Sequence, residues 1–199
     1  MNNKHTLAAI FSMGTKGERA DAKALAKRLG LKVREAKREV EFLEKLGMVV
    51  NEGGSARLTP KGRKSIKVVF IGGGFELIHY GHVYTISKAR ALGDVLVVSV
   101  ARDSTIRRRK KREPIISEKD RVTLLSSLRQ VDAAILGVEG DIYVTLEKIK
   151  PDIVALGYDQ YHLEDEIKRE ADKRGMKLAV VRLDSPYPKI KTTRILNEL

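Results

Sequence analysis

The residue types most able to do chemistry lie in one short segment, where an apolar strand gives way to a predicted helix. Three consecutive glycines, residues 72–74, are followed by His79 and His82, which bracket Gly81. Glycine lets a phosphate approach the backbone closely, and the start of a helix offers unpaired N–H groups and the positive end of its dipole. Imidazoles at the same place donate hydrogen bonds to phosphate oxygens as charge develops on them. The segment therefore predicts a nucleotide-handling enzyme.

Two familiar phosphate motifs and a metal site fit this segment less well. Gly72 and Gly74 are followed by Leu77 where the dinucleotide fingerprint requires a third glycine, and no Gly-Lys-Ser/Thr of a Walker loop follows. His79 and His82 have no third strong metal ligand nearby in the sequence. An ordinary strand–helix turn needs one glycine, whereas three in a row favour a ligand close to the backbone.

Strands and helices alternate from residue 66 onward. Strands are predicted at residues 67–71, 94–101, 131–136, 152–156 and 178–183, with helices at 82–92, 118–128, 142–149 and 163–174. This alternation predicts an α/β domain, with a Rossmann-like parallel sheet covered on both faces. Ligands of such sheets bind beyond the carboxyl ends of the strands. We therefore expect the glycines, Arg102, Tyr158 and Asp159 to line one crevice.

Residues 1–64 follow a different pattern and are expected to form a small domain of their own, separate from the domain at 65–199. Helices are predicted at residues 4–14, 20–29 and 32–46, and glycines lie where each helix ends. Residues 48–58 read as a β-hairpin with glycines at its turn. Three helices and a hairpin are typical of a winged helix-turn-helix domain.

The third predicted helix has two distinct faces. Its apolar stripe, at spacings of three and four, consists of Val33, Ala36, Val40 and Leu43. The opposite face carries Glu41 and four cations that are candidates for contact with DNA: Arg34, Lys37, Arg38 and Lys45. A solvated face on a scaffold or dimerisation module is the alternative interpretation, and Glu35, Glu39 and Glu44 favour it.

The charge of the chain indicates a polyanionic partner. The net charge is +13 over 199 residues. Residues 1–65 hold 15 Lys and Arg against 7 Asp and Glu, whereas residues 66–199 hold 24 against 19. Charge alone does not distinguish DNA from nucleotide phosphates.

Composition also excludes several classes of site. The chain has no cysteine, which excludes a disulfide framework, a thiolate nucleophile and a cysteine metal site. No apolar run approaches the ~20 residues of a membrane span, and residues 1–15 lack a signal-peptide pattern. We expect a cytoplasmic protein that makes no membrane contact, and we expect a homodimer.

Two segments resemble the signatures of the HIGH-type nucleotidyltransferase superfamily. The first signature, usually Gly-Thr-Phe-Asp followed by His-x-Gly-His, corresponds to residues 73–82, where Gly74 and Glu76 replace the threonine and the aspartate. The second, Ile-Ser-x-Thr-x-Ile, resembles Ile-Lys-Thr-Thr-Arg-Ile at residues 190–195. Thr192 and Thr193 would begin a terminal helix there and offer hydroxyl and N–H groups to β- and γ-phosphates.

The blocks between these signatures resemble the archaeal FAD synthase branch of the superfamily, which transfers an adenylyl group to FMN. They include Ala-Arg-Asp at 101–103, the basic run at 107–112, Pro-Ile-Ile at 114–116 and Lys-Pro-Asp-Ile-Val-Ala-Leu-Gly-Tyr-Asp-Gln at 150–160. The resemblance spans residues 66–199 and implies ATP and FMN as substrates, with Mg²⁺ bridging their phosphates. We expect the basic run to be a mobile, solvated loop that closes over the leaving group.

The resemblance and the residue chemistry together name the candidate site. His79 and His82 would be catalytic. The nucleotide-binding candidates comprise this pair and the residues around the two signatures: Gly73, Gly74, Phe75, Tyr80, Gly81, Asp159, Tyr187, Thr192 and Thr193. Cations expected to contact phosphate are Arg112, Arg121, Lys191 and Arg194. No metal ligand is assigned to the protein itself.

Two other functions stay open from the sequence. The superfamily signatures do not separate adenylyl transfer to FMN from cytidylyl transfer, in which CTP reacts with a phosphorylated alcohol such as glycerol 3-phosphate. A regulator, whose C-terminal domain senses a nucleotide while its N-terminal domain binds DNA, is the third hypothesis.

Overall fold

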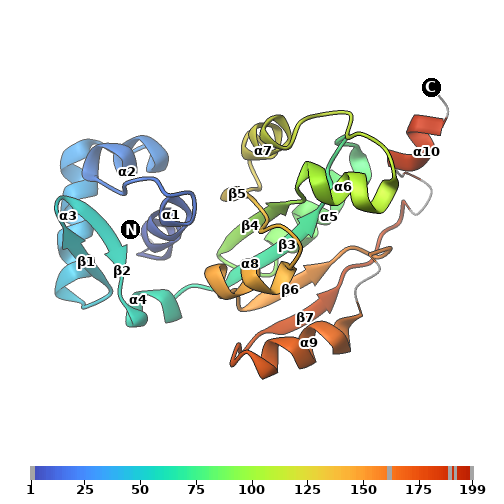
Figure 1. Ribbon diagram of the computed structural model, residues 1–199. Helices are drawn as coiled ribbons and strands as arrows, with labels where there is room; N and C mark the ends of the chain where they lie inside the picture. Colours follow the sequence, from blue (N-terminus) through green and yellow to red (C-terminus); the bar gives the residue numbers. More distant parts are fainter. Residues whose placement is uncertain (1–2, 161–162, 188–189, 191, 198–199) are drawn as a thin grey trace. The chain divides into compact units, whose positions relative to one another are not determined.

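Two compact units, Met1–Lys67 and Val68–Leu199, make up the chain in the computed structural model (Figure 1). We call them the N-terminal unit and the C-terminal unit. The structure describes residues 3–160, 163–187, 190 and 192–197. No helix in these ranges has both the length and the apolar composition needed to cross a bilayer.

The N-terminal unit has the predicted three helices and hairpin, followed by one short helix that was not predicted. Its elements are α1 (Asn3–Thr15), α2 (Ala22–Leu29), α3 (Val33–Lys45), β1 (Val49–Glu52), β2 (Ser55–Leu58) and α4 (Pro60–Lys64). The carboxylate of Asp21 accepts a hydrogen bond from the Ala24 N–H and so caps α2. Thr59 caps α4 in the same way, and Pro60 provides its first residue. β1 and β2 pair antiparallel.

Helix α3 packs through a shorter apolar stripe than predicted. Ala36, Val40 and Leu43 are buried, but Val33 is 51% exposed, so its predicted place in the core is wrong. Val33 is the first residue of the helix, one turn before the first buried position. Glu39 is buried instead, and its carboxylate accepts a hydrogen bond from the hydroxyl of Thr6 at 3.4 Å.

The C-terminal unit is a five-stranded parallel sheet with helices on both faces, which confirms the predicted Rossmann-like α/β fold (Figure 1). The strands are β3 (Val68–Gly73), β4 (Val95–Val100), β5 (Ala133–Leu136), β6 (Ile153–Leu156) and β7 (Ala179–Arg182), in the order β5-β4-β3-β6-β7. The helices are α5 (Tyr80–Arg90), α6 (Asp103–Lys110), α7 (Glu118–Ser126), α8 (Ile142–Ile149), α9 (Glu164–Lys173) and α10 (Thr192–Asn197).

The core of the C-terminal unit surrounds β3 and β4, which are buried on both faces of the sheet. The strand order gives the sheet a switch point beside β3. Val69 and Ile71 of β3 share a hydrophobic cluster with Ile86 of α5 and Leu125 of α7. From β3 the chain adds strands in one direction to β5 and then returns to the other side with β6. A crevice is expected beyond the carboxyl ends of β3 and β6, because the connections leave these strands in opposite directions.

The basic run at residues 107–112 differs from the expected mobile loop. Residues 107–110 form the last turn of α6, and Lys111 ends the helix with a φ of 54°. Cations are favoured at this end of a helix because its free carbonyl groups carry the negative end of the dipole. Arg107 also forms an ion pair with Glu113, with 2.9 Å from Nε to Oε2. The loop prediction for this part of the run is therefore wrong.

Candidate active site

A cleft in two compartments lies at the carboxyl ends of β3, β4 and β6. The larger compartment has a volume of about 370 Å³ and the smaller one about 240 Å³. Eight residues line both compartments, which makes the two continuous: Gly72, Gly73, Gly74, Phe75, His82, Asp159, Gln160 and Thr192. The cleft brings together the glycines, Arg102, Tyr158 and Asp159, as predicted, and it is also lined by His82 of the first signature and Thr192 of the second.

Gly73 and Gly74 differ in the space that the protein leaves for a side chain. A Cβ atom on Gly73 would lie 2.8 Å from the ring of Phe75, so the protein itself requires glycine at this position. A Cβ on Gly74 would meet no heavy atom closer than the Ile106 Cδ1, at 4.0 Å, and Gly74 has no positive φ. The fold itself therefore leaves room for a side chain at residue 74. Phe75 itself has a φ of 50°, a strained value of the kind found at ligand-binding turns.

The two histidines lie at the start of α5 with their rings together. His79 is the N-cap residue and His82 lies in the first turn, with 3.9 Å between the ring centroids. The ring of Phe75 is 5.3 Å from that of His82, measured between centroids. Both Nδ1 atoms are buried, and neither has a hydrogen-bond partner among the described residues. Buried polar atoms are normally paired, so these two atoms point to a bound ligand.

Burial keeps the imidazole rings of His79 and His82 neutral at pH 7. Burial lowers the pKa of His82 to about 4; His79 beside it lowers this pKa as well, while the carboxylate of Asp159 opposes the change. Burial also lowers the pKa of His79, again against the effect of Asp159. Each neutral ring has one donor and one acceptor nitrogen.

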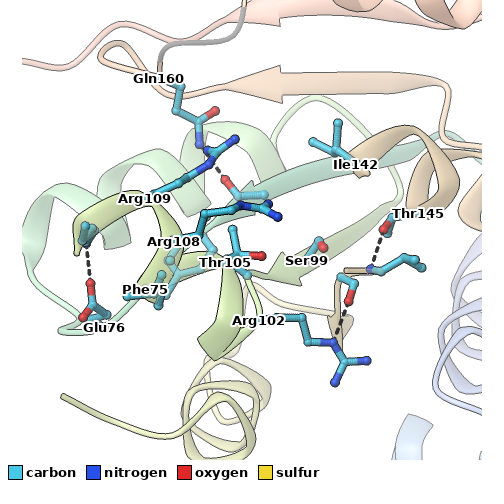
Figure 2. A pocket seen from close by; sticks show the side chains of 18 of the residues that line it. Phe75, Glu76, Ser99, Arg102, Thr105, Arg108, Arg109, Ile142, Thr145 and Gln160 are labelled. Atoms are coloured by element: carbon cyan, nitrogen blue, oxygen red, sulfur yellow. Dashed lines mark hydrogen bonds and ion pairs between the residues drawn. The ribbon is translucent and has the colours of Figure 1, made fainter. Parts of the chain in front are cut away.

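Gln160 joins two edges of the cleft and was not named from the sequence. Its Nε2 donates a hydrogen bond to the Gly72 carbonyl at 2.5 Å, and its Oε1 accepts one from the Gly157 N–H at 3.2 Å (Figure 2). Arg182 supports this loop by donating to the carbonyls of Gly157 and Gln160. The only signal in the sequence was the position of Gln160 at the end of the block at 150–160.

Arg121 holds the glycine loop in place, which corrects its predicted contact with phosphate. Its side chain is completely buried. The guanidinium donates to the carbonyls of Ile116, at 3.0 Å, and Gly74, at 2.5 Å, and to the carboxylate of Asp103, at 2.5 Å. A buried charge is tolerated only when it is paired and hydrogen-bonded. These contacts leave Arg121 no access to the cleft.

The end of α6 is attached to the glycine loop through Glu76. This carboxylate is buried and accepts hydrogen bonds from Lys110 and from both Arg112 Nη atoms, at 2.6 and 3.1 Å. Burial raises the pKa of Glu76, but the bonds from Arg112 and Lys110 outweigh it and the pKa is lowered. The charge of Arg112 is thus compensated within the protein. Arg108 and Arg109 line the larger compartment instead (Figure 2).

The remaining predicted residues lie in several places. Thr192 lines both compartments, and its hydroxyl lies 3.5 Å from the Leu77 carbonyl. The rings of Tyr80 and Tyr187 pack edge to face at 4.8 Å. Among the described residues, neither compartment is lined by Tyr80, Tyr187, Arg112 or Arg194. Lys191 and the side chain of Thr193 lie outside the described part of the chain.

Two protein families match parts of this chain. Residues 70–198 match the cytidylyltransferase-like family, and residues 18–64 match the family of HemN C-terminal domains. The first match covers more than half of the chain. The chain therefore belongs to the cytidylyltransferase-like family, which confirms the nucleotidyltransferase class predicted from the two signatures.

Individual relatives are similar over most of their own length. An FAD synthase of Thermococcus onnurineus is 42% identical over 140 residues, which are 69% of this chain and 93% of the relative. An FAD synthase of Methanothermus fervidus is 52% identical over 114 residues, 56% of this chain and 78% of the relative.

Solved structures share the fold. A lipopolysaccharide core biosynthesis protein of Thermoplasma volcanium is 42% identical, with a TM-score of 0.58 over 60% of this chain and 98% of that chain. A pantoate-beta-alanine ligase of Francisella tularensis is 20% identical, with a TM-score of 0.51 over 67% of this chain and 66% of its own, and shows the fold alone.

Two glycine substitutions separate a structural from a ligand-binding requirement. Gly73→Ala should lower the free energy of unfolding by about 1–3 kcal/mol, because the new methyl overlaps the Phe75 ring. Gly74→Ala should leave stability unchanged or slightly raised, yet weaken nucleotide binding because the methyl occupies the ligand's space. Urea unfolding and calorimetric titration with ATP measure the two effects. Unchanged ATP affinity in Gly74→Ala would show that no ligand uses this space.

The buried His82 ring should make stability depend on pH. Its folded pKa, about 4, lies below the ordinary value of 6.5, so the unfolded chain takes up this proton first as the pH falls. The stability contribution is complete above pH 6.5 and is lost toward pH 4, amounting to roughly 3 kcal/mol. Urea unfolding across this range should show a smaller loss in His82→Gln than in the wild type. Parallel curves for the two proteins would contradict the assignment.

Proposed function

We propose that the enzyme transfers the adenylyl group of ATP to FMN and so produces FAD and pyrophosphate. The observation that carries the proposal is the similarity to FAD synthases, which are 40–52% identical to this chain and are covered for up to 93% of their length. The histidine pair and the glycine loop supply the chemistry such a transfer requires. These relatives favour adenylyl transfer over cytidylyl transfer from CTP to a phosphorylated alcohol, which the signatures alone allow.

The reaction needs positioning more than proton transfer. The phosphate of FMN is largely dianionic at neutral pH because its second pKa is ~6, so no general base is required. One of its oxygens attacks the α-phosphorus of ATP, the bond from that phosphorus to the bridging oxygen breaks, and pyrophosphate leaves. Catalysis then depends on holding the two substrates in line and on stabilising the negative charge that spreads over the phosphate oxygens.

The histidine pair is assigned to the α-phosphate. Its two unpartnered Nδ1 atoms are buried beside the glycine loop, where a polyphosphate would lie against the backbone at Gly74. Negative charge nearby raises the pKa of an imidazole, so the bound triphosphate would oppose the effect of burial on these rings. His79 and His82 would then donate hydrogen bonds that strengthen as charge develops.

The two compartments suit the two substrates. We place the nucleotide of ATP in the smaller one, between His79, Asp159 and Thr192. The larger one has apolar walls at Phe70, Ile142 and Leu156 and suits an isoalloxazine ring, while Arg108 and Arg109 face the FMN phosphate. Its volume of about 370 Å³ lies in the range of small-molecule sites, about 300–1,000 Å³.

The reaction would use a divalent cation, which we take to be Mg²⁺. It would supply charge neutralisation on the triphosphate. Among the described residues, no group of three or more His, Asp or Glu side chains is arranged to hold a metal ion. Mg²⁺ usually binds through substrate phosphates, water and one or two carboxylates. Asp159, which lines both compartments, is the carboxylate we assign beside it.

A paired-substrate assay tests the function. Purified enzyme with Mg²⁺ should release pyrophosphate from ATP in the presence of FMN, and not from CTP in the presence of glycerol 3-phosphate. His82→Ala should lower kcat by about 10²–10³, as expected for loss of one donor to the transition state. His5→Ala, in α1 of the N-terminal unit, serves as the control and should retain full turnover.

Either of two results would refute this assignment. Pyrophosphate release in the second mixture alone would establish the cytidylyltransferase alternative. Wild-type turnover of His82→Ala with FMN and ATP would remove the histidine from the mechanism, even if the reaction itself is as proposed.

A further inference from the structure

The N-terminal unit presents a helix with cations on its exposed surface. Helix α2 ends at Gly30, which has a φ of 67°, and α3 begins three residues later, as in a helix-turn-helix. The outer face of α3 carries four exposed cations: Arg34, Lys37, Arg38 and Lys45. None of the four forms a hydrogen bond or ion pair with another described residue. By contrast, Arg121 and Arg112 of the C-terminal unit are both paired with carboxylates.

The acidic residues of α3 offset only part of this charge. Glu35 accepts a hydrogen bond from the Lys32 N–H at 2.9 Å, and Glu44 accepts one from the Asn51 N–H at 3.2 Å. Glu39 is buried and bonded to Thr6. Glu41 and Glu44 are exposed, so the exposed residues of α3 include four cations and two carboxylates. This excess of positive charge favours contact with DNA over the solvated-face interpretation.

Two large apolar side chains are exposed on the same helix. Val33 is 51% exposed and Phe42 is 50% exposed. Val33 precedes Lys37 by four residues, and Phe42 follows Arg38 by four, so each lies next to a cation on the helix surface. Apolar side chains on a groove-bound helix contact thymine methyl groups, while the cations beside them contact phosphates.

From these observations we propose that the N-terminal unit binds duplex DNA, with α3 in the major groove. This binding goes beyond the proposed nucleotidyl transfer and does not depend on it. An α-helix fits the major groove, and residues near the N-terminus of the second helix of a helix-turn-helix contact base edges. Val33, Arg34 and Lys37 occupy that end of α3. Arg38 and Lys45 extend the basic face along the helix toward the phosphate backbone.

Fluorescence anisotropy of a labelled 24-base-pair duplex titrated with the full-length chain tests this binding. The association constant should fall steeply between 50 and 200 mM salt, because each phosphate contact contributes about −0.9 to the slope of log K against log salt. The variant Arg34→Ala/Lys37→Ala/Arg38→Ala should bind at least tenfold more weakly at 50 mM salt and reduce the slope by about two to three. Pyrophosphate release by this variant should equal that of the wild type, and its far-ultraviolet circular dichroism spectrum should match the wild-type spectrum, which together show that both units are folded.

A charge-matched variant on α9, Lys168→Ala/Arg169→Ala/Lys173→Ala, controls for net charge and should bind the duplex like the wild type. The milder single variant Lys37→Gln should show a smaller loss in the same direction. Equal losses in the α3 and α9 triple variants would overturn the proposal, as would no binding at 50 mM salt. Tighter binding to single-stranded RNA of equal length, or to vesicles of anionic lipid, would also overturn it and identify a different partner.

Discussion

The buried guanidinium of Arg121 is the interaction on which the geometry of the cleft depends. It joins three segments that are distant in sequence: the carbonyl of Gly74 in the glycine loop, the carboxylate of Asp103 at the start of α6, and the carbonyl of Ile116 before α7. Removing one partner of such a group would leave a charge buried without compensation, which costs several kcal/mol. The glycine loop that lines the cleft is therefore held in place by a buried charge that does not itself line the cleft.

Ion pairs within the protein also compensate cations of the basic run. Glu76 takes the place of the usual aspartate of the signature, and it binds Lys110 and Arg112. These two cations attach the end of α6 to the glycine loop, and Arg108, Arg109 and Lys110 line the larger compartment. The two histidines, by contrast, are neutral, because burial lowers their pKa more than the carboxylate of Asp159 raises it. In the N-terminal unit, the cations of α3 pair with no residue in the part of the chain that the structure describes.

Much of the candidate site was predictable because its signals are local. The spacing of His79 and His82 after three glycines specified the chemistry, and the alternation of strands and helices specified a parallel sheet with its ligands at one edge. The predictions that failed depended on partners distant in the sequence. Nothing near Arg121 indicates that Gly74 and Asp103 will surround it, and the cations at 107–112 did not reveal that α6 would extend into them.

The amino-acid sequence by itself determined the class of fold, the extent of most helices and strands, and the identity of the two signatures, because periodicity and short motifs are properties of neighbouring residues. Tertiary structure decided which side chains are accessible. It buried Arg121 and Glu39, left Val33 exposed, and introduced Gln160 as the connection between Gly72 and Gly157. These outcomes depend on packing and hydrogen bonding between segments that only the folded chain brings together.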